Sequence, residues 1–538
     1  MKLKKLLLGD EALALGAINA GLSGAYAYPG TPSTEILEFV QQNPVARERA
    51  IHSHWSSNEK TAVEEALGMS FCGRRSMVSM KHVGLNVAAD PFVNSAMTGA
   101  NGGMLVISAD DPSMHSSQNE QDSRFYASFA LLPVLEPRSQ QQAYDMAAYG
   151  FALSEEYGVP VMVRMVTRLA HSRANVEIDS DAAPENALHY PEHTAQWVLM
   201  PGNSRRRYPR LIETYNALAE AGEHSPFNTF SPGSDRRIGI LASGIAANYV
   251  EECFDGACPF PMVVIGQYPL PVGMIGRLAD SCDAVLVVEE GQPVIEKELR
   301  GLLDRGVRVY GKLDGHLPRT GELTPDSVAA CLASLVHDVA PDFALPAAVE
   351  TDNMVMARPP ALCQGCGHRD VYAALNAALA QYENAKVFGD IGCYTLGWLA
   401  PFNAIDTVVD MGASITMAKG AADAGQHPVV AVIGDSTFTH SGMTGLLDAV
   451  NENSPVSIII SDNLTTGMTG GQDSQGTGKL EQICLGLGVS PDHLHTIDSL
   501  PRTVAEMQAL FAAELEYQGV SVIIARRECI QTARRHKK

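Results

Sequence analysis

Two loops in the last third of the sequence place oxygen ligands at the ends of apolar segments. Residues 429–433 form an apolar run that ends at Gly434 and Asp435, and residues 456–460 form a second run that leads to Asn463. Short apolar runs of this kind are typical of strands buried in parallel sheets. Because the carboxyl ends of parallel strands meet at one edge of a sheet, Asp435 and Asn463 are expected to lie close together and to bind a hard divalent cation.

The residues beside these oxygens suit a diphosphate held by that cation. Gly434 lets the main chain approach phosphate groups closely, and a helix after Asp435 would point its positive end at them. Ser436 stands where such sites usually have a second glycine, and a main-chain carbonyl near Thr465 can complete the cation ligands. The arrangement resembles the Mg²⁺ and diphosphate site of thiamine-diphosphate enzymes. The alternative is an ordinary strand–turn–helix with two polar turns.

The composition describes a soluble globular protein with a sizeable core and an acidic surface. Of the 538 residues, 46% are hydrophobic and 19% are charged, and the net charge is −22. This length is enough for about three domains. The negative charge argues against nucleic acid or an anionic membrane surface as the main partner, and an acidic electron carrier would need a local basic patch to dock.

The N-terminus and the cysteines bear on the compartment. The first residues imitate a signal peptide, but Asp10 and Glu11 interrupt the apolar stretch, so an amphipathic helix is expected from Asp10 onward. None of the apolar runs is long enough to span a membrane. Ten scattered cysteines are typical of a reducing compartment rather than of a disulfide framework. A cytoplasmic protein is therefore expected.

Three blocks of the chain alternate apolar, strand-like runs with helical segments. Strands followed by helices throughout predict an α/β protein with three doubly wound parallel-sheet domains. The expected domains are residues 1–199, 236–340 and 355–538. They are separated by a Pro/Gly/Ser-rich linker at 222–235 and a Pro/Ala-rich linker at 341–360.

Long, ordered motifs in the first and third blocks carry a resemblance to a known family. They are YPGTPSTEI (28–36), WSSNEKTAVEEALG (55–68), KHVGLNVAADP (81–91), SADDPSMHSSQNEQDSR (108–124), LCQGCGHRD (362–370), GDIGCYTLG (389–397), MGASI (411–415), GDSTFTHSG (434–442) and DNLTTGMTGGQ (462–472). Through them the chain resembles the large, thiamine-binding subunit of the indolepyruvate:ferredoxin oxidoreductases, within the 2-oxoacid:ferredoxin oxidoreductases. The resemblance implies a pyrimidine-binding, a transketolase-C-like and a diphosphate-binding domain, in that order.

The resemblance also implies roles for residues at both ends of the cofactor. Glu59 matches the family's glutamate that interacts with N1′ of the aminopyrimidine, a role that a dry site would help. The alternative is a first-turn glutamate of a capped helix, and Glu64 or Glu65 could be mistaken for it. Thr31 is expected near the reacting carbon. The glycines expected to line the cofactor are Gly30, Gly365, Gly392, Gly412 and Gly434.

Four cysteines match the positions that hold a proximal [4Fe–4S] cluster in related thiamine-binding subunits. They are Cys363, Cys366, Cys393 and Cys529. Four thiolates are what such a cluster requires. The family's usual Cys-Pro-Gly-Cys-Pro-His differs here in two places, reading Cys-Gln-Gly-Cys-Gly-His at 363–368. The C-x-x-C pair alone could instead be a redox dithiol, half of a zinc site or two buried thiols.

A 2-oxoacid substrate needs a cation or a donor for its carboxylate. The candidates are Lys81, His82 and Arg124, and His82 is also a candidate catalytic residue. A structural histidine and ordinary ion pairs are the alternatives. Trp55 or Tyr394 could line a pocket for an aryl side chain, although either can equally belong to the core.

The leading hypothesis is a catalytic subunit that oxidatively decarboxylates arylpyruvates, such as indolepyruvate, to aryl-acetyl-CoA. Thiamine diphosphate, Mg²⁺ and one [4Fe–4S] cluster would be its cofactors, and CoA its co-substrate. Decarboxylation would leave an enamine whose electrons pass to ferredoxin or a related carrier. Family large subunits usually continue into a ferredoxin-like domain that this sequence lacks, so a separate protein would supply it or electrons would leave from the cluster. A smaller partner subunit and a homodimer core are also implied.

Two other functions stay open on sequence grounds. A non-oxidative decarboxylase or carboligase would need Glu59, Asp435 and Asn463 but neither the cluster nor CoA. A non-catalytic subunit would keep the cofactor fold only as an assembly surface.

Overall fold

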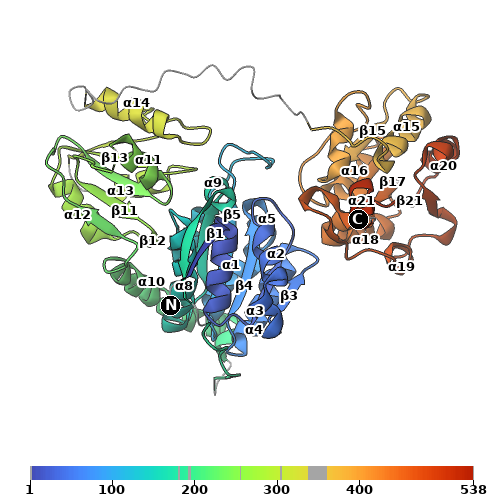
Figure 1. The fold of residues 1–538 in the computed structure, drawn as a ribbon. Coiled ribbons are helices and arrows are strands. Elements are labelled where there is room, and N and C mark those ends of the chain that lie inside the picture. The colour runs from blue at the N-terminus through green and yellow to red at the C-terminus, as the bar shows by residue number, and fades with distance from the viewer. Residues whose placement is uncertain are drawn as a thin grey trace. The chain divides into compact units, whose positions relative to one another are not determined.

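The computed structural model describes residues 3–179, 182–191, 195–254, 256–302, 306–336 and 360–536. The chain folds into two compact units, Met1–Glu350 and Thr351–Lys538 (Figure 1). The predicted linker at 341–360 lies outside the described residues except for its last position, and so do the predicted domain boundaries at 340 and 355. The three-domain boundaries therefore stay a prediction.

The first unit contains a seven-stranded sheet in the order β12-β6-β7-β5-β4-β2-β3, parallel except for the β12–β6 pair. Its central strands β5 and β7 are rich in apolar residues and fully buried, as expected of strands covered by helices. The strands are β2 (Gly24–Ala27), β3 (His52–Trp55), β4 (Ser76–Lys81), β5 (Met104–Asp110), β6 (Val134–Leu135), β7 (Val161–Val166) and β12 (Gln267–Tyr268).

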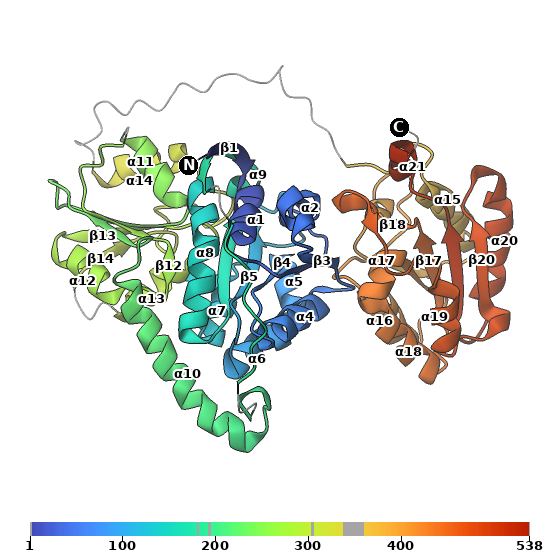
Figure 2. The same ribbon diagram turned by 60° about the horizontal axis from the view of Figure 1, so that its bottom comes forward.

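Helices alternate with these strands along the chain. They are α1 (Gly9–Asn19), α2 (Thr34–Gln42), α3 (Pro44–Glu48), α4 (Glu59–Phe71), α5 (His82–Val87), α6 (Ala89–Thr98), α7 (Arg124–Ala130), α8 (Gln140–Tyr157) and α9 (Thr167–His171). Helices α1 and α8 lie side by side (Figure 2). Their close approach depends on Gly16, where an added Cβ would lie 2.2 Å from the carbonyl oxygen of Tyr144.

The N-terminal residues form a strand and then the predicted helix. Strand β1 (Leu3–Leu8) pairs with β8 (Arg173–Ile178) in an antiparallel two-stranded sheet, and α1 begins at Gly9. The helix expected from Asp10 onward is thus confirmed, but its amphipathic character is not, because every residue from Ala12 to Ile18 is buried. Among the helices of the described residues, none combines the length and apolar character needed to cross a membrane.

A second, five-stranded sheet of this unit has the order β14-β13-β10-β11-β9. The predicted linker at 222–235 contains one of its strands: β9 pairs antiparallel with β11 at the sheet edge, a position that tolerates a short polar strand. The elements are α10 (Pro201–Gly222), β9 (Thr229–Ser231), β10 (Gly239–Ser243), α11 (Ala246–Cys253), β11 (Met262–Ile265), α12 (Val272–Asp280), β13 (Ala284–Val288), α13 (Val294–Leu302), β14 (Arg308–Tyr310) and α14 (Pro325–Leu335).

A buried network of charges connects the two sheets of the first unit. Arg164 on β7 contacts Asp110 at 2.6 Å and Glu136 at 2.5 Å, and the guanidinium of Arg124 contacts Asp122 at 2.6 Å. All these side chains are buried. Burial alone would raise the pKa of Asp122, but the charges of Arg124 and Arg164 hold that pKa well below its usual range.

Arg124, a candidate ligand for the substrate carboxylate, belongs to this network. Its three nitrogen atoms donate to Asp122, to the Tyr268 hydroxyl and to the Glu290 carbonyl, and Glu289 lies 3.0 Å away. A guanidinium that is surrounded by carboxylates and carbonyls has no donor left for a substrate. We therefore assign Arg124 to the packing of the two sheets.

The second unit is an all-parallel sheet in the order β15-β16-β17-β21-β20. Its main elements are α15 (Gly367–Leu379), β15 (Lys386–Gly389), α16 (Ala413–Asp423), β16 (Val429–Gly434), α18 (Met443–Asn451), β17 (Ser457–Asp462), α19 (Leu480–Gly486), β20 (Leu494–Asp498), α20 (Val504–Leu515), β21 (Ser521–Arg526) and α21 (Ile530–His536).

Alternate residues of these strands enter two separate cores. Val430 and Val432 pack with α15 and α20 on one face, whereas Ala431 and Ile433 pack with α16 and α18 on the other (Figure 2). The two-residue period of a strand explains this division. The predicted α/β class is confirmed, and the three large sheets are mostly parallel, with antiparallel pairs only at β12–β6 and β11–β9 among the described strands.

We predict that Arg164→Ala lowers the free energy of unfolding of the first unit by about 3–5 kcal/mol, because Asp110 and Glu136 would stay buried without their cation. Urea unfolding of the full chain measures the effect. Arg138→Ala is the matched control: Arg138 pairs with Glu251 at 2.6 Å near the surface, so its loss should cost about 1 kcal/mol or less. Equal losses in the two variants would contradict the assigned role of the network.

Candidate active site

The two oxygen-bearing loops predicted from the sequence lie side by side. Strands β16 and β17 are parallel neighbours with Gly434 opposite Ser461, so Asp435 and Asn463 follow adjacent strand ends. Asp435 also begins a continuous helical segment made of α17 (Asp435–Thr437), a π-helical turn (Phe438–Gly442) and α18. The positive end of this segment faces the same edge of the sheet.

The carboxyl group of Asp435 is buried and only partly satisfied by the protein. The side chain is 2% exposed, and among the described residues its Oδ2 atom has no hydrogen-bond partner. Burial, and then the nearby charge of Asp462, raise the pKa of Asp435 to about 7. An orphaned buried carboxylate oxygen beside a second carboxylate is what a divalent cation would compensate. The residues therefore fit the predicted metal.

Hydrogen bonds within the second loop fix the orientation of the Asn463 side chain. The side-chain oxygen of Asn463 accepts the N–H of Thr465 at 3.1 Å and keeps a lone pair for a ligand. The Thr465 hydroxyl donates to the Gln472 carbonyl, and Ser436 lies 3.0 Å from Thr466, which links the two loops. Asp462 is satisfied by Arg526 at 2.6 Å, so it is not an open ligand.

Two glycines predicted to line the cofactor are needed for packing against Tyr394. A Cβ added at Gly392 or Gly434 would lie 2.5 or 2.4 Å from Cε1 of this ring. The ring is buried, and its hydroxyl donates to Ile391 and lies 2.8 Å from the Thr437 hydroxyl. Tyr394 thus packs against the backbone of the first loop and does not line an aryl pocket.

The glycine at 412 belongs to a helix cap that the sequence did not single out. Gly412 has a φ of 97°, a backbone conformation that favours glycine. The carboxylate of Asp390 accepts the N–H groups of Gly412 at 2.8 Å and Ser414 at 3.0 Å. Asp390 thereby fixes the N-terminus of α16. Its position directly after β15 was the available signal, because polar residues at such strand ends often cap the next helix.

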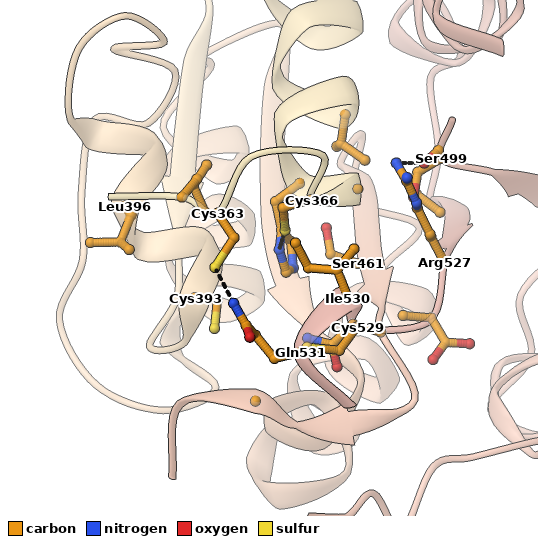
Figure 3. Close-up of a pocket in the computed structure, with 18 of the residues that line it drawn as sticks. Cys363, Cys366, Cys393, Leu396, Ser461, Ser499, Arg527, Cys529, Ile530 and Gln531 are labelled. Atoms are coloured by element: carbon orange, nitrogen blue, oxygen red, sulfur yellow. Dashed lines mark hydrogen bonds between the residues drawn. The ribbon is translucent and has the colours of Figure 1, made fainter. Parts of the chain in front are cut away.

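The four predicted cysteines line one cavity of about 100 Å³ (Figure 3). Cys363 and Cys366 precede α15, Cys393 begins a 3₁₀ helix (Cys393–Trp398), and Cys529 follows β21. They belong to three separate segments of the chain, which the fold brings together. Asn463 and Gly467 also line the cavity, so the second cation loop forms one of its walls.

Polar side chains contact two of the four sulfur atoms. The Gln531 side chain donates to Sγ of Cys363 at 3.4 Å (Figure 3). Nδ1 of His368 lies 3.0 Å from Sγ of Cys366. The positive φ of Gly365, 79°, allows the turn between the first two cysteines. Burial raises the pKa of the Cys393 thiol to about 12, so the free thiol is protonated until a metal displaces its proton.

In the first unit, Glu59 is set apart from the two glutamates that could be confused with it. Glu59 begins α4, is 6% exposed and packs against Gly84, where a Cβ would lie 2.5 Å from its Oε1 atom. Glu64 is exposed and pairs with Lys60, and Glu65 accepts a hydrogen bond from Ser56. Only Glu59 of the three has the dry setting that its predicted role calls for.

Lys81, Thr31 and Gly30 come together at the carboxyl end of the first sheet. The Lys81 ammonium donates to the Ser116 carbonyl at 2.7 Å, and the Ser116 hydroxyl donates to the Thr31 carbonyl at 3.3 Å. Gly30 lies against Lys81, with an added Cβ 3.2 Å from that of the lysine. Burial lowers the pKa of Lys81 to about 8, and the charge of Asp111 opposes this shift.

His82 follows Lys81 and is nearly fully buried. Its Nε2 atom lies 3.2 Å from the Asn119 carbonyl, and its Nδ1 atom has no hydrogen-bond partner among the described residues. The ring of His82 lies near Asp110 as well as Asn119, and among the described residues one of its nitrogens has no hydrogen-bond partner. Arg124, in contrast, is committed to the charge network.

Two family models and a solved structure are similar to this chain. The model "Pyruvate flavodoxin/ferredoxin oxidoreductase, thiamine diP-bdg" matches residues 15–219, and "Thiamine pyrophosphate enzyme, C-terminal TPP binding domain" matches residues 390–525. A solved 2-oxoglutarate:ferredoxin oxidoreductase from Magnetococcus marinus shares the fold, with a TM-score of 0.51, 16% identity, and coverage of 62% of this chain and 65% of that one.

Two curated relatives extend over nearly the whole sequence. The indolepyruvate oxidoreductase subunit IorA of Archaeoglobus fulgidus is 37% identical, with 98% of this chain and 86% of that protein covered. The protein of the same name from Methanothermobacter marburgensis is also 37% identical, with 97% and 86% covered. The chain therefore belongs to the family of the indolepyruvate oxidoreductase subunit IorA, among the thiamine-pyrophosphate-dependent 2-oxoacid oxidoreductases.

Proposed function

We propose that this chain is the thiamine-binding catalytic subunit of an oxidoreductase that converts an arylpyruvate and CoA to the aryl-acetyl-CoA and CO₂. The two electrons released pass to a ferredoxin-type carrier. The observation that carries the proposal is the loop around Asn463, which supplies an oxygen to the cation site and also lines the four-cysteine cavity. A second, smaller subunit and a homodimer core belong to the proposal, as does Mg²⁺.

Residues of the second unit would hold the cofactor's diphosphate through the cation. Asp435 and Asn463 supply the oxygen ligands, a main-chain carbonyl near Thr465 adds another, and the helix that begins at Asp435 faces the phosphates. When bound, thiamine diphosphate supplies a nucleophilic carbon that attacks the keto group and takes up the electron pair released with CO₂. Gly434 and Ser436 keep the loop small enough for this approach.

Residues of the first unit would serve the reaction of the 2-oxoacid. Glu59 would exchange a proton with N1′ of the pyrimidine from a site closed to water. The Lys81 ammonium would bind the substrate carboxylate, with Thr31 nearby. His82 would hold or move a proton at Nδ1, the atom that has no hydrogen-bond partner among the described residues.

The four cysteines would bind one [4Fe–4S] cluster that takes the electrons one at a time. The cluster explains why four sulfur atoms meet in one cavity beside the cation loop. The CoA thiol then takes the acyl group, so the sum is one 2-oxoacid, one CoA and two oxidised carriers giving one acyl-CoA, one CO₂, one proton and two reduced carriers.

Glu59→Gln should lower kcat for oxidation of indolepyruvate by about 10²–10⁴-fold, because the amide cannot exchange a proton with the pyrimidine. Thiamine diphosphate should still bind, which calorimetry would show. Glu64→Gln, an exposed position on the same helix, is the control and should leave kcat unchanged. Full activity of the Glu59 variant would defeat its assignment and favour a non-catalytic subunit.

Lys81→Met should raise KM for the 2-oxoacid by about 10–100-fold, the value of a hydrogen bond to a charged group. Because its pKa is about 8, Lys81 is protonated below that pH and neutral above it. KM of the wild type should therefore rise as pH increases from 7 to 9. Lys81→Arg stays charged and should remove that rise. An unchanged pH profile in this variant would exclude Lys81 as the carboxylate ligand.

Anaerobically prepared protein should contain about four iron atoms per chain and show an EPR signal after reduction with dithionite. Cys393→Ser should lose both, whereas Cys72→Ser, a cysteine outside the cavity, should keep them. Protein without iron, in which Cys363 and Cys366 react freely with iodoacetamide, would refute the cluster. Aldehyde release from indolepyruvate in the absence of any electron acceptor would then point to a non-oxidative decarboxylase.

A further inference from the structure

A second group of metal-ligating side chains lies in the first unit and includes none of the residues assigned above. Asp10 lies in the first turn of α1, Glu35 lies in the first turn of α2, and His171 ends α9. One ligand atom from each lies within 4.8 Å of the other two, and Nε2 of His171 is 3.5 Å from Oε2 of Glu35. These residues are far apart in the sequence and meet through the packing of three helices.

Asp10 makes this group different from an ordinary acidic surface cluster. The side chain is 0% exposed, and among the described residues both of its carboxylate oxygens are without a hydrogen-bond partner. Oε2 of Glu35 is also buried, and its contact is with Nε2 of His171, which lowers the pKa of Glu35. A buried carboxylate that lacks donors is costly unless a positive charge or a proton compensates it.

The charges around Asp10 increase that cost. Burial, followed by the charges of Glu35 and Glu11, raises the pKa of Asp10 well above its usual range. Glu11 is engaged elsewhere, because it accepts the N–H of Leu8 at 2.8 Å. The imidazole of His171 pairs with Glu35, which raises the pKa of the histidine. Asp10 lies beside this pair as a buried carboxylate that has no hydrogen-bond partner among the described residues.

We propose that Asp10, Glu35 and His171 bind a divalent transition-metal ion of the Zn²⁺ or Mn²⁺ class. One imidazole nitrogen with two carboxylate oxygens is a donor set for such ions, whereas Mg²⁺ and Ca²⁺ prefer oxygen alone. Metal bonds of about 2.0–2.1 Å place tetrahedral ligands about 3.3 Å apart, close to the observed separation of Glu35 and His171. Both residues are about one-third exposed, so water can reach the fourth position.

The ion would act as a structural clamp beside the substrate cluster. Helix α2 begins at Thr34, directly after the turn in which Ser33 donates to the Gly30 carbonyl. Tying α2 to α1 and α9 fixes the end of that turn. Thr167 at the other end of α9 donates to Asp111, which also accepts a hydrogen bond from the N–H of Ser116. The clamp would thereby hold both sides of the Gly30–Thr31 loop without touching a substrate.

Titration of metal-stripped full-length protein with Co²⁺ tests the proposal. Co²⁺ in a nitrogen–oxygen site of low coordination absorbs in the visible, and Zn²⁺ should displace it. A Cys363→Ser/Cys366→Ser background removes binding by the cysteine cavity. We expect one Co²⁺ per chain in this background, with affinity reduced at least about tenfold by Asp10→Asn or His171→Gln. Asp435→Asn, which removes a ligand of the other cation site, should leave the signal intact.

Thermal unfolding separates the ion from a proton on Asp10. If the ion binds, adding Zn²⁺ raises the melting temperature of the parent protein and leaves that of Asp10→Asn unchanged. If Asp10 is simply protonated, Asp10→Asn is at least as stable as the parent at every Zn²⁺ concentration, and Co²⁺ gives no visible band. Either of these last two results would overturn the proposal. Because asparagine has the shape of aspartate, the variant should fold normally, which circular dichroism checks.

Discussion

The pairing of β16 with β17 is the constraint on which the cofactor site depends. These strands are parallel neighbours in register from Val430 with Ser457 to Gly434 with Ser461. Their alternating residues are fixed in two separate cores, so a slip by one residue would move every apolar side chain to the wrong face. The register therefore sets the separation of Asp435 and Asn463 more firmly than any contact between the two loops does.

Compensation of buried negative charge takes two forms in this chain. Between the sheets of the first unit, Arg124 and Arg164 neutralise several carboxylates, and the network is closed within the protein. At Asp435 and at Asp10 the carboxylates are just as buried, but no arginine or lysine among the described residues pairs with them. A buried charge costs free energy wherever it lies. The two open sites are thus the places where an external cation or a proton has to complete the structure.

The sequence was sufficient for features that depend on local pattern. Apolar runs with polar ends predicted the parallel sheets, and the two strand ends predicted that Asp435 and Asn463 would meet. Features that depend on distant partners were out of reach. Arg124 was a candidate substrate ligand because it is a cation in a polar segment of the sequence. Its actual partners, Glu289 and Tyr268, lie more than a hundred residues later in the chain. Tyr394 was ambiguous for the same reason, since only the fold shows Gly392 and Gly434 packed on its ring.

The loop after β17 ties the cation site to the cysteine cavity by main-chain bonds. The carbonyl of Asn463 accepts the N–H of Cys529 at 3.1 Å, and its side-chain oxygen shapes the turn that leads to Thr465. Gly467, a few residues on, lies against the sulfur atoms of Cys393 and Cys529, where an added Cβ would be 3.4 and 4.0 Å away. A displacement of this loop would therefore be transmitted to two of the four sulfur atoms. Under the proposed function, loading of the diphosphate site and the geometry of the electron acceptor would depend on the same segment of chain.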